Sequence, residues 1–323
     1  MNTGLSIYIP FFKGLRYLRE AVESVRAQSN PNWTLVVMDD CGPDGTEACV
    51  WLKALNDPRI SYIRHSENKG MVANWNACLD HAAFDFAKKN SSQTQSQLVT
   101  LLHDDDRLLP NYVDLMLQEY TATPEAALYF CGAEIIDGAG KKVFSVPDAI
   151  KKLIAPAKPS FTLQGPAAFE ALLAGCFIMC PTVCYNLAVI GERRFTLGLK
   201  QVQDLDFYLR LLADGLTLKG SSQKAYAYRR HSSNATAIQT QSLLRFREEV
   251  ELYNTWAQRL TTLGFNRAAT VAASKRIIVL NLLYCILRDL VSFSFAHAQT
   301  KTRFLLQNVL NSQTQPQLEG SQT

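Results

Sequence analysis

The 323-residue sequence lacks the short patterns that mark several common classes of protein. No Gly-x-Gly-x-x-Gly follows its first apolar run, which argues against a dinucleotide-binding dehydrogenase. Its eight cysteines form no Cys-x-x-Cys pair. Cys176, Cys180 and Cys184 recur every four residues, but the proline among them favours strand and turn over a helix that would align three thiols. We therefore expect reduced cysteines rather than a metal–thiolate site.

Long apolar runs and a strong charge imbalance are also missing. The N-terminus has no basic segment followed by a long apolar stretch, so we expect no signal peptide. The apolar run 277–287 ends at Arg288 and Asp289, well short of a membrane span, which predicts a buried or interfacial helix. A formal charge of +4, scattered along the chain, gives no reason to expect nucleic acid as a partner.

The first third of the sequence does contain an alternation of short apolar runs and helical patterns. With an ordinary globular composition of 47% apolar and 19% charged residues, this alternation predicts an α/β fold, a mainly parallel sheet flanked by helices. From about residue 239 onward the pattern is helical, without strand signals. The expected strands lie at about 5–10, 33–38, 59–63 and 98–102, and the expected helices at about 14–28, 70–88 and 203–214.

Three consecutive carboxylates, Asp104, Asp105 and Asp106, directly follow the apolar run 98–102. Adjacent like charges repel, and a fold tolerates them most easily when a cation or hydrogen-bond donors neutralise them. Ligands of open α/β sheets gather at the carboxyl ends of the strands. The cluster therefore predicts a cation and nucleotide site first, and a solvated turn only second.

Six motifs occur in the order in which one enzyme family carries them. They are residues 6–10 (SIYIP) with the helix 17–25, 36–40 (VVMDD) with 44–46 (DGT), 67–70 (ENKG) with Asn76, 103–106 (HDDD), 203–206 (QDLD) through Arg210, and 228–231 (YRRH). Together they resemble the family 2 glycosyltransferases, which have the GT-A fold, a Rossmann-like sheet that binds nucleotide sugars. The resemblance covers about residues 5–235.

This resemblance implies metal-assisted transfer of a sugar, with inversion, from a nucleoside-diphosphate sugar. The departing diphosphate develops negative charge, which Mg²⁺ or Mn²⁺ would neutralise. Asp105 aligns with the second aspartate of the family's DxD motif and is the expected metal ligand, and His231 resembles a residue that reaches the metal or the diphosphate. Asp104 would meet the ribose or the same cation, and Asp106 would support these ligands or cap a helix.

The resemblance also implies a donor site at the end of the second strand. Asp39 would accept a hydrogen bond from a uracil or thymine N–H, which favours a UDP- or dTDP-linked donor. A pair of turn-forming aspartates is the alternative. The expected donor-binding residues are Pro10, Asp39, Asp40, Lys69, Gly70 and Asp104.

Asp204 resembles the acidic residue that acts as the general base. Inverting transfer requires the acceptor hydroxyl to lose its proton as it attacks the anomeric carbon, and a carboxylate suits that task. A helix N-cap is the alternative, and the two roles do not exclude each other. Arg210 is a further candidate for the site, although its spacing from Asp206 also fits a helix-surface ion pair.

Two departures from the family pattern concern the donor site. His103 stands where the first aspartate of the DxD motif is usual, so the ribose contact is expected to be shifted or shared. Residues 11–13 (FFK) replace a common Thr-Tyr-Asn. Backbone contacts to the base would survive this replacement, whereas side-chain contacts would not.

We expect a catalytic domain at 1–235, a C-terminal helical region at 236–311 and a disordered tail at 312–323. The acceptor would be a growing glycan or a lipid-linked saccharide. The C-terminal helices would dock a partner subunit, rest on a membrane surface or simply pack. The expected location is cytoplasmic, or peripheral at the inner face of the membrane.

Two other functions fit parts of the pattern. A nucleotidyltransferase that makes sugar nucleotides would use a related sheet, but the Gly-rich basic loop usual after its first strand is absent. A non-catalytic module that binds nucleotide sugars would not need Asp204.

Overall fold

The computed structural model of the chain describes residues 4–88, 97–145, 150–151, 153–230 and 242–310. The chain forms two compact units. The first contains Met1–Gln164, Phe177–Gly198 and Asp206–His231, and the second contains Gly165–Cys176, Leu199–Leu205 and Ser232–Thr323. Two short segments of the expected catalytic domain therefore group with the C-terminal helices.

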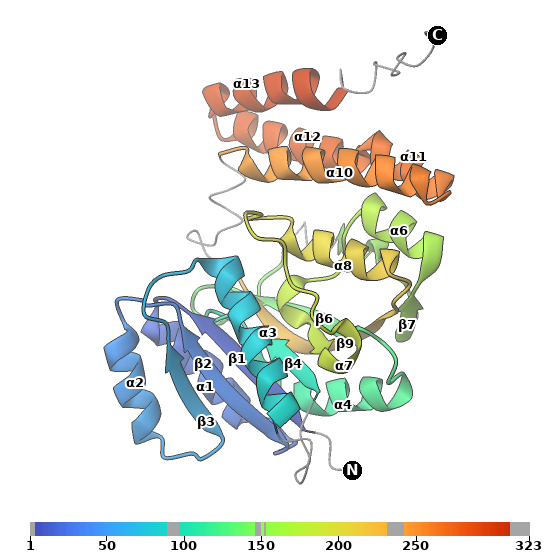
Figure 1. Ribbon diagram of the computed structural model, residues 1–323. Coiled ribbons are helices and arrows are strands. Elements are labelled where there is room, and N and C mark those ends of the chain that lie inside the picture. Colours follow the sequence, from blue (N-terminus) through green and yellow to red (C-terminus); the bar gives the residue numbers. More distant parts are fainter. Residues whose placement is uncertain (1–3, 89–96, 146–149, 152, 231–241, 311–323) are drawn as a thin grey trace. The chain divides into compact units, whose positions relative to one another are not determined.

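A nine-stranded sheet is the centre of the first unit (Figure 1). Its strands follow the order β3-β2-β1-β4-β8-β6-β9-β5, and β7 pairs with β9. The first four strands in this order are parallel, whereas β8 pairs antiparallel with both β4 and β6. The strands are β1 (Leu5–Phe11), β2 (Trp33–Asp39), β3 (Ile60–Arg64), β4 (Leu98–Leu101), β5 (Arg107–Leu108), β6 (Leu128–Ile136), β7 (Ser160–Leu163), β8 (Cys184–Asn186) and β9 (Leu218–Arg229).

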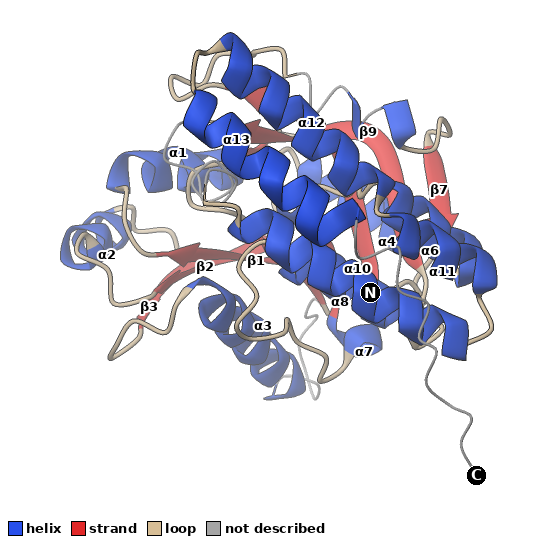
Figure 2. Ribbon diagram, turned by 90° about the horizontal axis from the view of Figure 1, so that it is seen from above, coloured by secondary structure: helices blue, strands red, loops and turns tan. Residues whose placement is uncertain are grey.

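Helices cover both faces of this sheet, as α1 and α3 on either side of the first strands show in Figure 2. The central strands β1, β2 and β4 are buried on both faces, which explains why their sequences are nearly continuous apolar runs. The helical elements are α1 (Leu15–Arg26), α2 (Gly45–Ala54), α3 (Met71–Lys88), α4 (Tyr112–Ala122), η1 (Cys180–Thr182), α7 (Leu187–Ile190) and α8 (Gln203–Ala213), whose first residues belong to the second unit.

The described part of the second unit is helical. Helix α12 contacts α13, α10 and α6, and α11 contacts α10 and α6. One stretch, Asn266–Val291, is long and apolar enough to cross a membrane by length and composition, with a mean hydropathy of 1.6. The elements are α6 (Gly165–Ala174), α10 (Leu244–Thr262), α11 (Asn266–Ser274), α12 (Arg276–Val291), α13 (Phe295–Phe304) and η2 (Leu305–Leu310).

The strands and helices expected from sequence are confirmed in the first third of the chain, and so is the helix expected at 203–214. The segment around Cys180 and Cys184 forms a short helical turn and a strand, as its proline indicates, and neither of these cysteines forms a disulfide. The tail at 312–323 lies outside the described residues. The apolar stretch that ends at Val291 is longer than the expected run 277–287, because it continues back through α11.

The turns that follow β1 and β2 touch each other at Gly42. A Cβ atom on this buried glycine would lie 1.6 Å from the carbonyl oxygen of Phe12. A Cβ on Gly45, at the start of α2, would lie 2.0 Å from Oδ2 of Asp39. Both positions therefore require glycine for close approach rather than for an unusual backbone angle.

We expect Gly42→Ala to lower the free energy of unfolding by about 3 kcal/mol, because the methyl group meets backbone that cannot move aside. The matched control is Gly215→Ala, where no atom lies within 4 Å of the added Cβ and only the positive φ of 78° is strained. That control should cost about 1 kcal/mol. Urea unfolding followed by circular dichroism measures both, and equal losses would contradict the close approach.

Candidate active site

The expected donor and metal residues of the first unit lie at one edge of the sheet. Strands β1, β2, β3 and β4 run parallel, so their carboxyl ends meet there. Pro10 lies near the end of β1, Asp39 and Asp40 at the end of β2, and Gly70 just before α3. The acidic turn 103–106 follows β4. The edge is where ligands of open α/β sheets bind.

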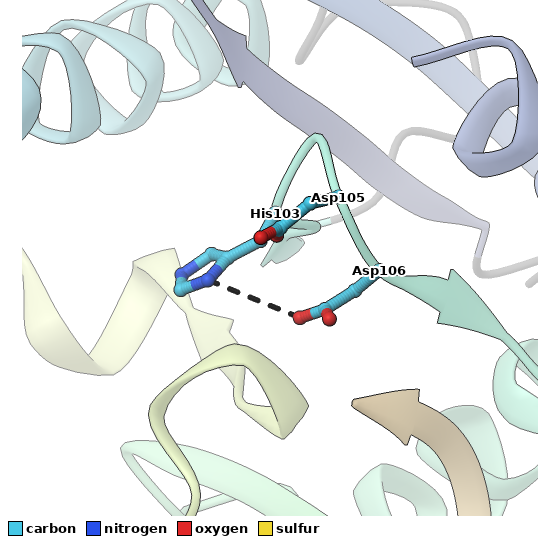
Figure 3. Close-up of side chains that lie close together, drawn as sticks. All are labelled: His103, Asp105 and Asp106. Carbon is cyan, nitrogen blue, oxygen red and sulfur yellow. Dashed lines mark ion pairs between the residues drawn. The ribbon is translucent and has the colours of Figure 1, made fainter. Parts of the chain in front are cut away.

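The acidic turn brings three potential metal ligands together (Figure 3). One ligand atom from each of His103, Asp105 and Asp106 lies within 4.8 Å of the others. All three belong to the connection between β4 and β5, so they lie close together along the chain. Asp105, the expected metal ligand, is thus accompanied by the two neighbours that the sequence marked as secondary candidates.

Asp106 is fully buried and anchored from β9. Its Oδ1 accepts a hydrogen bond from the backbone N–H of Arg229 at 2.6 Å, and its Oδ2 accepts one from the hydroxyl of Tyr226 at 2.9 Å. Burial and the charge of Asp105 nevertheless hold the pKa of Asp106 well above its usual range. The position is therefore one that a nearby cation would stabilise.

The side chain of Arg229 supports the same turn. Its guanidinium is completely buried and donates from Nε to the carbonyl oxygen of Asp105 at 2.6 Å. It also donates to Glu20 on α1 and to the carbonyl oxygens of Asp137 and Gly138. Since the planar fork of arginine fixes several acceptors at once, this residue sets the backbone position of Asp105.

Asp104 connects the acidic turn to the end of β1. Its carboxylate accepts a hydrogen bond from the backbone N–H of Phe12. Burial, and next the charge of Asp105, raise the pKa of Asp104 to about 8. Asp104 is therefore costly to ionise next to the charge of Asp105.

His103 packs against α3 rather than pointing into solvent. Its ring stacks on Trp75 with centroids 5.3 Å apart, and its Nδ1 lies 3.9 Å from Oδ2 of Asp106. Burial lowers the pKa of His103, while the charge of Asp105 acts in the opposite direction. A neutral imidazole in this place offers a nitrogen lone pair as a metal ligand.

The side chain of Asp39 is directed into the protein. It is fully buried, Oδ1 accepts from the N–H of Gly42, and Oδ2 accepts from Arg64 and Tyr62. These contacts are those of an aspartate that shapes a turn, the alternative considered from the sequence. The direct contact with a base that the resemblance implies stays a prediction.

Asp40 fixes the entrance to α3. Its two carboxylate oxygens accept hydrogen bonds from the backbone N–H groups of Lys69 and Gly70, at 2.7 and 2.9 Å. Gly70 has a φ of 85°, which a glycine adopts without strain. The side chain of Lys69 is exposed, so its ammonium group is accessible to a charged ligand.

Asp204 is the second residue of α8 and is half-buried. Its Oδ1 accepts from the N–H of Leu205 at 2.8 Å, whereas a capping side chain reaches an N–H two or three residues on. Arg210 donates to Asp206 at 2.9 Å and to the carbonyl oxygen of Arg194, so the expected pair with Asp206 is present. His231 lies outside the described residues.

Sequence reasoning missed the residues that position the ligands. Arg229 lies inside the motif 228–231, which was its only signal. Tyr226 and Trp75 gave none, because an aromatic residue in an apolar strand or helix is normally core. Tyr62 and Arg64, which hold Asp39, were likewise hidden in an ordinary strand pattern.

Comparison with known sequences gives a consistent result. The model described as Glycosyl transferase family 2 matches residues 6–147. WcaA of Escherichia coli, named as a glycosyl transferase of colanic acid biosynthesis, is 25% identical over 213 residues, which are 66% of this chain and 67% of WcaA. TuaG of Bacillus subtilis, named as a glycosyltransferase of teichuronic acid biosynthesis, is 24% identical over 70% of this chain and 78% of its own length.

Solved structures show the same fold at low sequence identity. TarS 1-349 of S. aureus, solved with UDP-GlcNAc, has a TM-score of 0.55 and 14% identity over 94% of this chain and 92% of that one. The mannosyltransferase PcManGT of Pyrobaculum calidifontis, solved with GDP-Man and Mn²⁺, has a TM-score of 0.54 and 13% identity over 94% and 87%. With the sheet and the acidic turn described above, these findings show that the chain is a glycosyltransferase with the GT-A fold, whose residues 6–147 match the model of glycosyl transferase family 2.

Proposed function

We propose that this enzyme transfers a sugar from a UDP- or dTDP-linked donor to a hydroxyl of a glycan or lipid-linked saccharide, with inversion and with Mg²⁺ or Mn²⁺. The observation that carries the proposal is the convergence of His103, Asp105 and Asp106 at the carboxyl edge of the parallel strands. Nucleotidyl transfer and binding without catalysis are set aside, because the relatives are named as glycosyltransferases.

The donor atoms of the acidic turn fit a divalent cation. Carboxylate oxygens are preferred by Mg²⁺ and Mn²⁺, and both leave coordination positions for phosphate oxygens and water. Asp105 would be the principal ligand, His103 and Asp106 the neighbours, and His231 remains a predicted one. When bound, such a cation supplies positive charge to the leaving diphosphate.

The residues of the chain then divide the remaining work. Asp40 holds the backbone of Lys69 and Gly70, and the exposed Lys69 ammonium is placed to attract the donor diphosphate. Asp39 orders the turn 42–45 from beneath, and the predicted contact of its carboxylate with a uracil or thymine N–H is the basis of the proposed donor class. Asp104, which is held next to the end of β1 by the N–H of Phe12, would contact the ribose of the donor.

Asp204 would act as the general base that removes the proton of the acceptor hydroxyl. Asp204 lies in the first turn of α8, at the positive end of the helix dipole, and its side chain is only half-buried, as a group that meets a substrate needs to be. An attack by the acceptor itself, without an enzyme-bound sugar, inverts the anomeric centre. The names of the relatives in colanic and teichuronic acid biosynthesis support a polysaccharide-type acceptor.

The first test is binding of nucleotide sugars followed by thermal shift, with and without Mn²⁺. A donor present at 100 times its dissociation constant should stabilise the protein by about 2.7 kcal/mol. Stabilisation by a UDP- or dTDP-sugar only when Mn²⁺ is present is the expected result. Binding of GDP-sugars alone would contradict the proposed donor class. Equal stabilisation by the donor with Mn²⁺ and with a chelator in its place would contradict the metal site.

Asp105→Asn should lower metal-dependent donor hydrolysis by about 100-fold or more, since it removes the charge of the principal metal ligand. Release of nucleoside diphosphate, measured over a range of Mn²⁺ concentrations, gives the effect. Asp80→Asn is the matched control, because Asp80 is 65% exposed and pairs only with Arg194 among the ion pairs of the described residues. Full activity of the Asp105 variant would remove this residue from the metal site.

Arg229→Lys should weaken Mn²⁺ binding by about 10- to 100-fold, the usual effect of losing a group that orients a metal ligand. The lysine keeps the charge but cannot donate to Asp105, Glu20 and Gly138 together. Electron paramagnetic resonance of bound Mn²⁺ measures affinity directly. A variant that loses stability with unchanged Mn²⁺ affinity would show that Arg229 serves the fold alone.

Asp204→Asn should lower kcat for transfer by about 10²- to 10⁴-fold while leaving donor affinity unchanged, because a general base acts in the chemical step. Calorimetric titration with donor and Mn²⁺ provides the affinity, and an acceptor assay provides kcat. The control is Asp206→Asn. Asp206 lies two residues after Asp204 on α8 and pairs with Arg210. Equal losses in the two variants would point to the structure of α8 rather than to proton transfer.

A further inference from the structure

Most of the exposed surface of helix α12 is apolar. Its inward residues Ile278, Leu282 and Cys285 are buried in the second unit, where α12 contacts α10, α13 and α6. Six of its eight exposed residues are nevertheless leucine, tyrosine or valine, and the other two are arginines. A helix that faces only water normally carries polar residues on its exposed side.

The outward side forms one continuous surface, which we call the α12 stripe. Its members repeat at helical spacing, so they lie on a single face of the helix. Leu287 is 62% exposed, and Phe293 in the following turn is 80% exposed. Scattered apolar residues are normal on a surface, but a contiguous patch indicates a binding surface. The α12 stripe consists of Leu280, Leu283, Tyr284, Leu287, Leu290 and Val291.

An apolar groove lined by residues of α12, α13 and η2 extends this surface. Helices α12 and α13 lie side by side in Figures 1 and 2. The volume of the groove is about 450 Å³, and its walls include Leu290, Phe295 and Leu306. Arg303 lies among the lining residues and brings a cation to its edge. The apolar surface thus continues over two helices of the same unit.

The charge around the stripe has one sign. Residues 265–311 contain six lysines and arginines, of which the four arginines are exposed and the two lysines buried, and one acidic residue. That residue, Asp289, is buried and lies 2.5 Å from Nζ of Lys301, so it presents no negative charge at the surface. Arg276 is exposed and lies one turn before Leu280 on the same face. Apolar side chains flanked by cations are complementary to a surface of anionic lipid.

We propose that the α12 stripe docks this enzyme on an anionic lipid bilayer, with α12 lying in the plane of the interface. The helix rests on the membrane rather than crossing it, because its opposite side is committed to the core of the unit. Lys275, buried with a φ of 48°, also interrupts the helical stretch from α11 to α12. Delivery to a lipid-linked acceptor rests on the proposed function, whereas lipid binding does not.

The test is co-sedimentation of the full chain with vesicles of phosphatidylcholine alone or with 30% phosphatidylglycerol. We expect binding to the anionic vesicles, little binding to the neutral ones, and release at high salt. The double variant Leu283→Gln/Leu287→Gln should lower partitioning at least about tenfold, because two exposed leucines lose their contact with lipid. Arg276→Gln with Arg303→Gln should lower it about fivefold for each arginine.

Controls separate docking from folding and from chemistry. Val50→Gln alters a 66% exposed apolar residue on α2 and should leave partitioning unchanged. Donor hydrolysis without vesicles should be equal in all variants, so an inactive enzyme that still sediments would contradict only the proposed function. Absence of sedimentation by the wild type would overturn the docking proposal. If the wild type formed a dimer, did not bind vesicles, and became monomeric in the double leucine variant, the stripe would instead be an interface with a second copy of the chain.

Discussion

The buried carboxylate of Asp106 is the constraint on which the candidate site depends. It joins the acidic turn after β4 to β9, a strand more than a hundred residues away in sequence, through Tyr226 and the backbone of Arg229. Because the arginine side chain then holds the carbonyl oxygen of Asp105, both neighbours are positioned by the same strand end. Burying the Asp106 carboxylate costs solvation free energy, and the hydrogen bonds from Tyr226 and Arg229 offset part of that cost.

The other aspartates at the edge of the sheet act in the same way. Asp39 holds the turn after β2, and Asp40 holds the entrance to α3. Asp44 accepts from the N–H of Gly14 and thereby fixes the start of α1. The turns after three parallel strands are consequently tied to one another by carboxylates that accept from backbone N–H groups.

The sequence was sufficient to predict the strands and helices of the first third, because central parallel strands are nearly continuous apolar runs and their helices are periodic. It also identified the acidic turn and its position at a strand end. It could not show that Asp39 is buried, since a turn-forming and a ligand-binding aspartate look identical in one sequence. Nor could it find Tyr226 as a partner of Asp106, because that contact depends on the pairing of β5 with β9.

Hydrogen bonds from backbone N–H groups allow the side chains around the site to be substituted without loss of these bonds. The amides of Phe12, Lys69 and Arg229 donate to carboxylates whatever side chain each residue carries. Only proline would delete such a bond. Positions next to the site are thus free to diversify toward new sugars while the carboxylates keep their geometry, and a phenylalanine at position 12 illustrates that freedom.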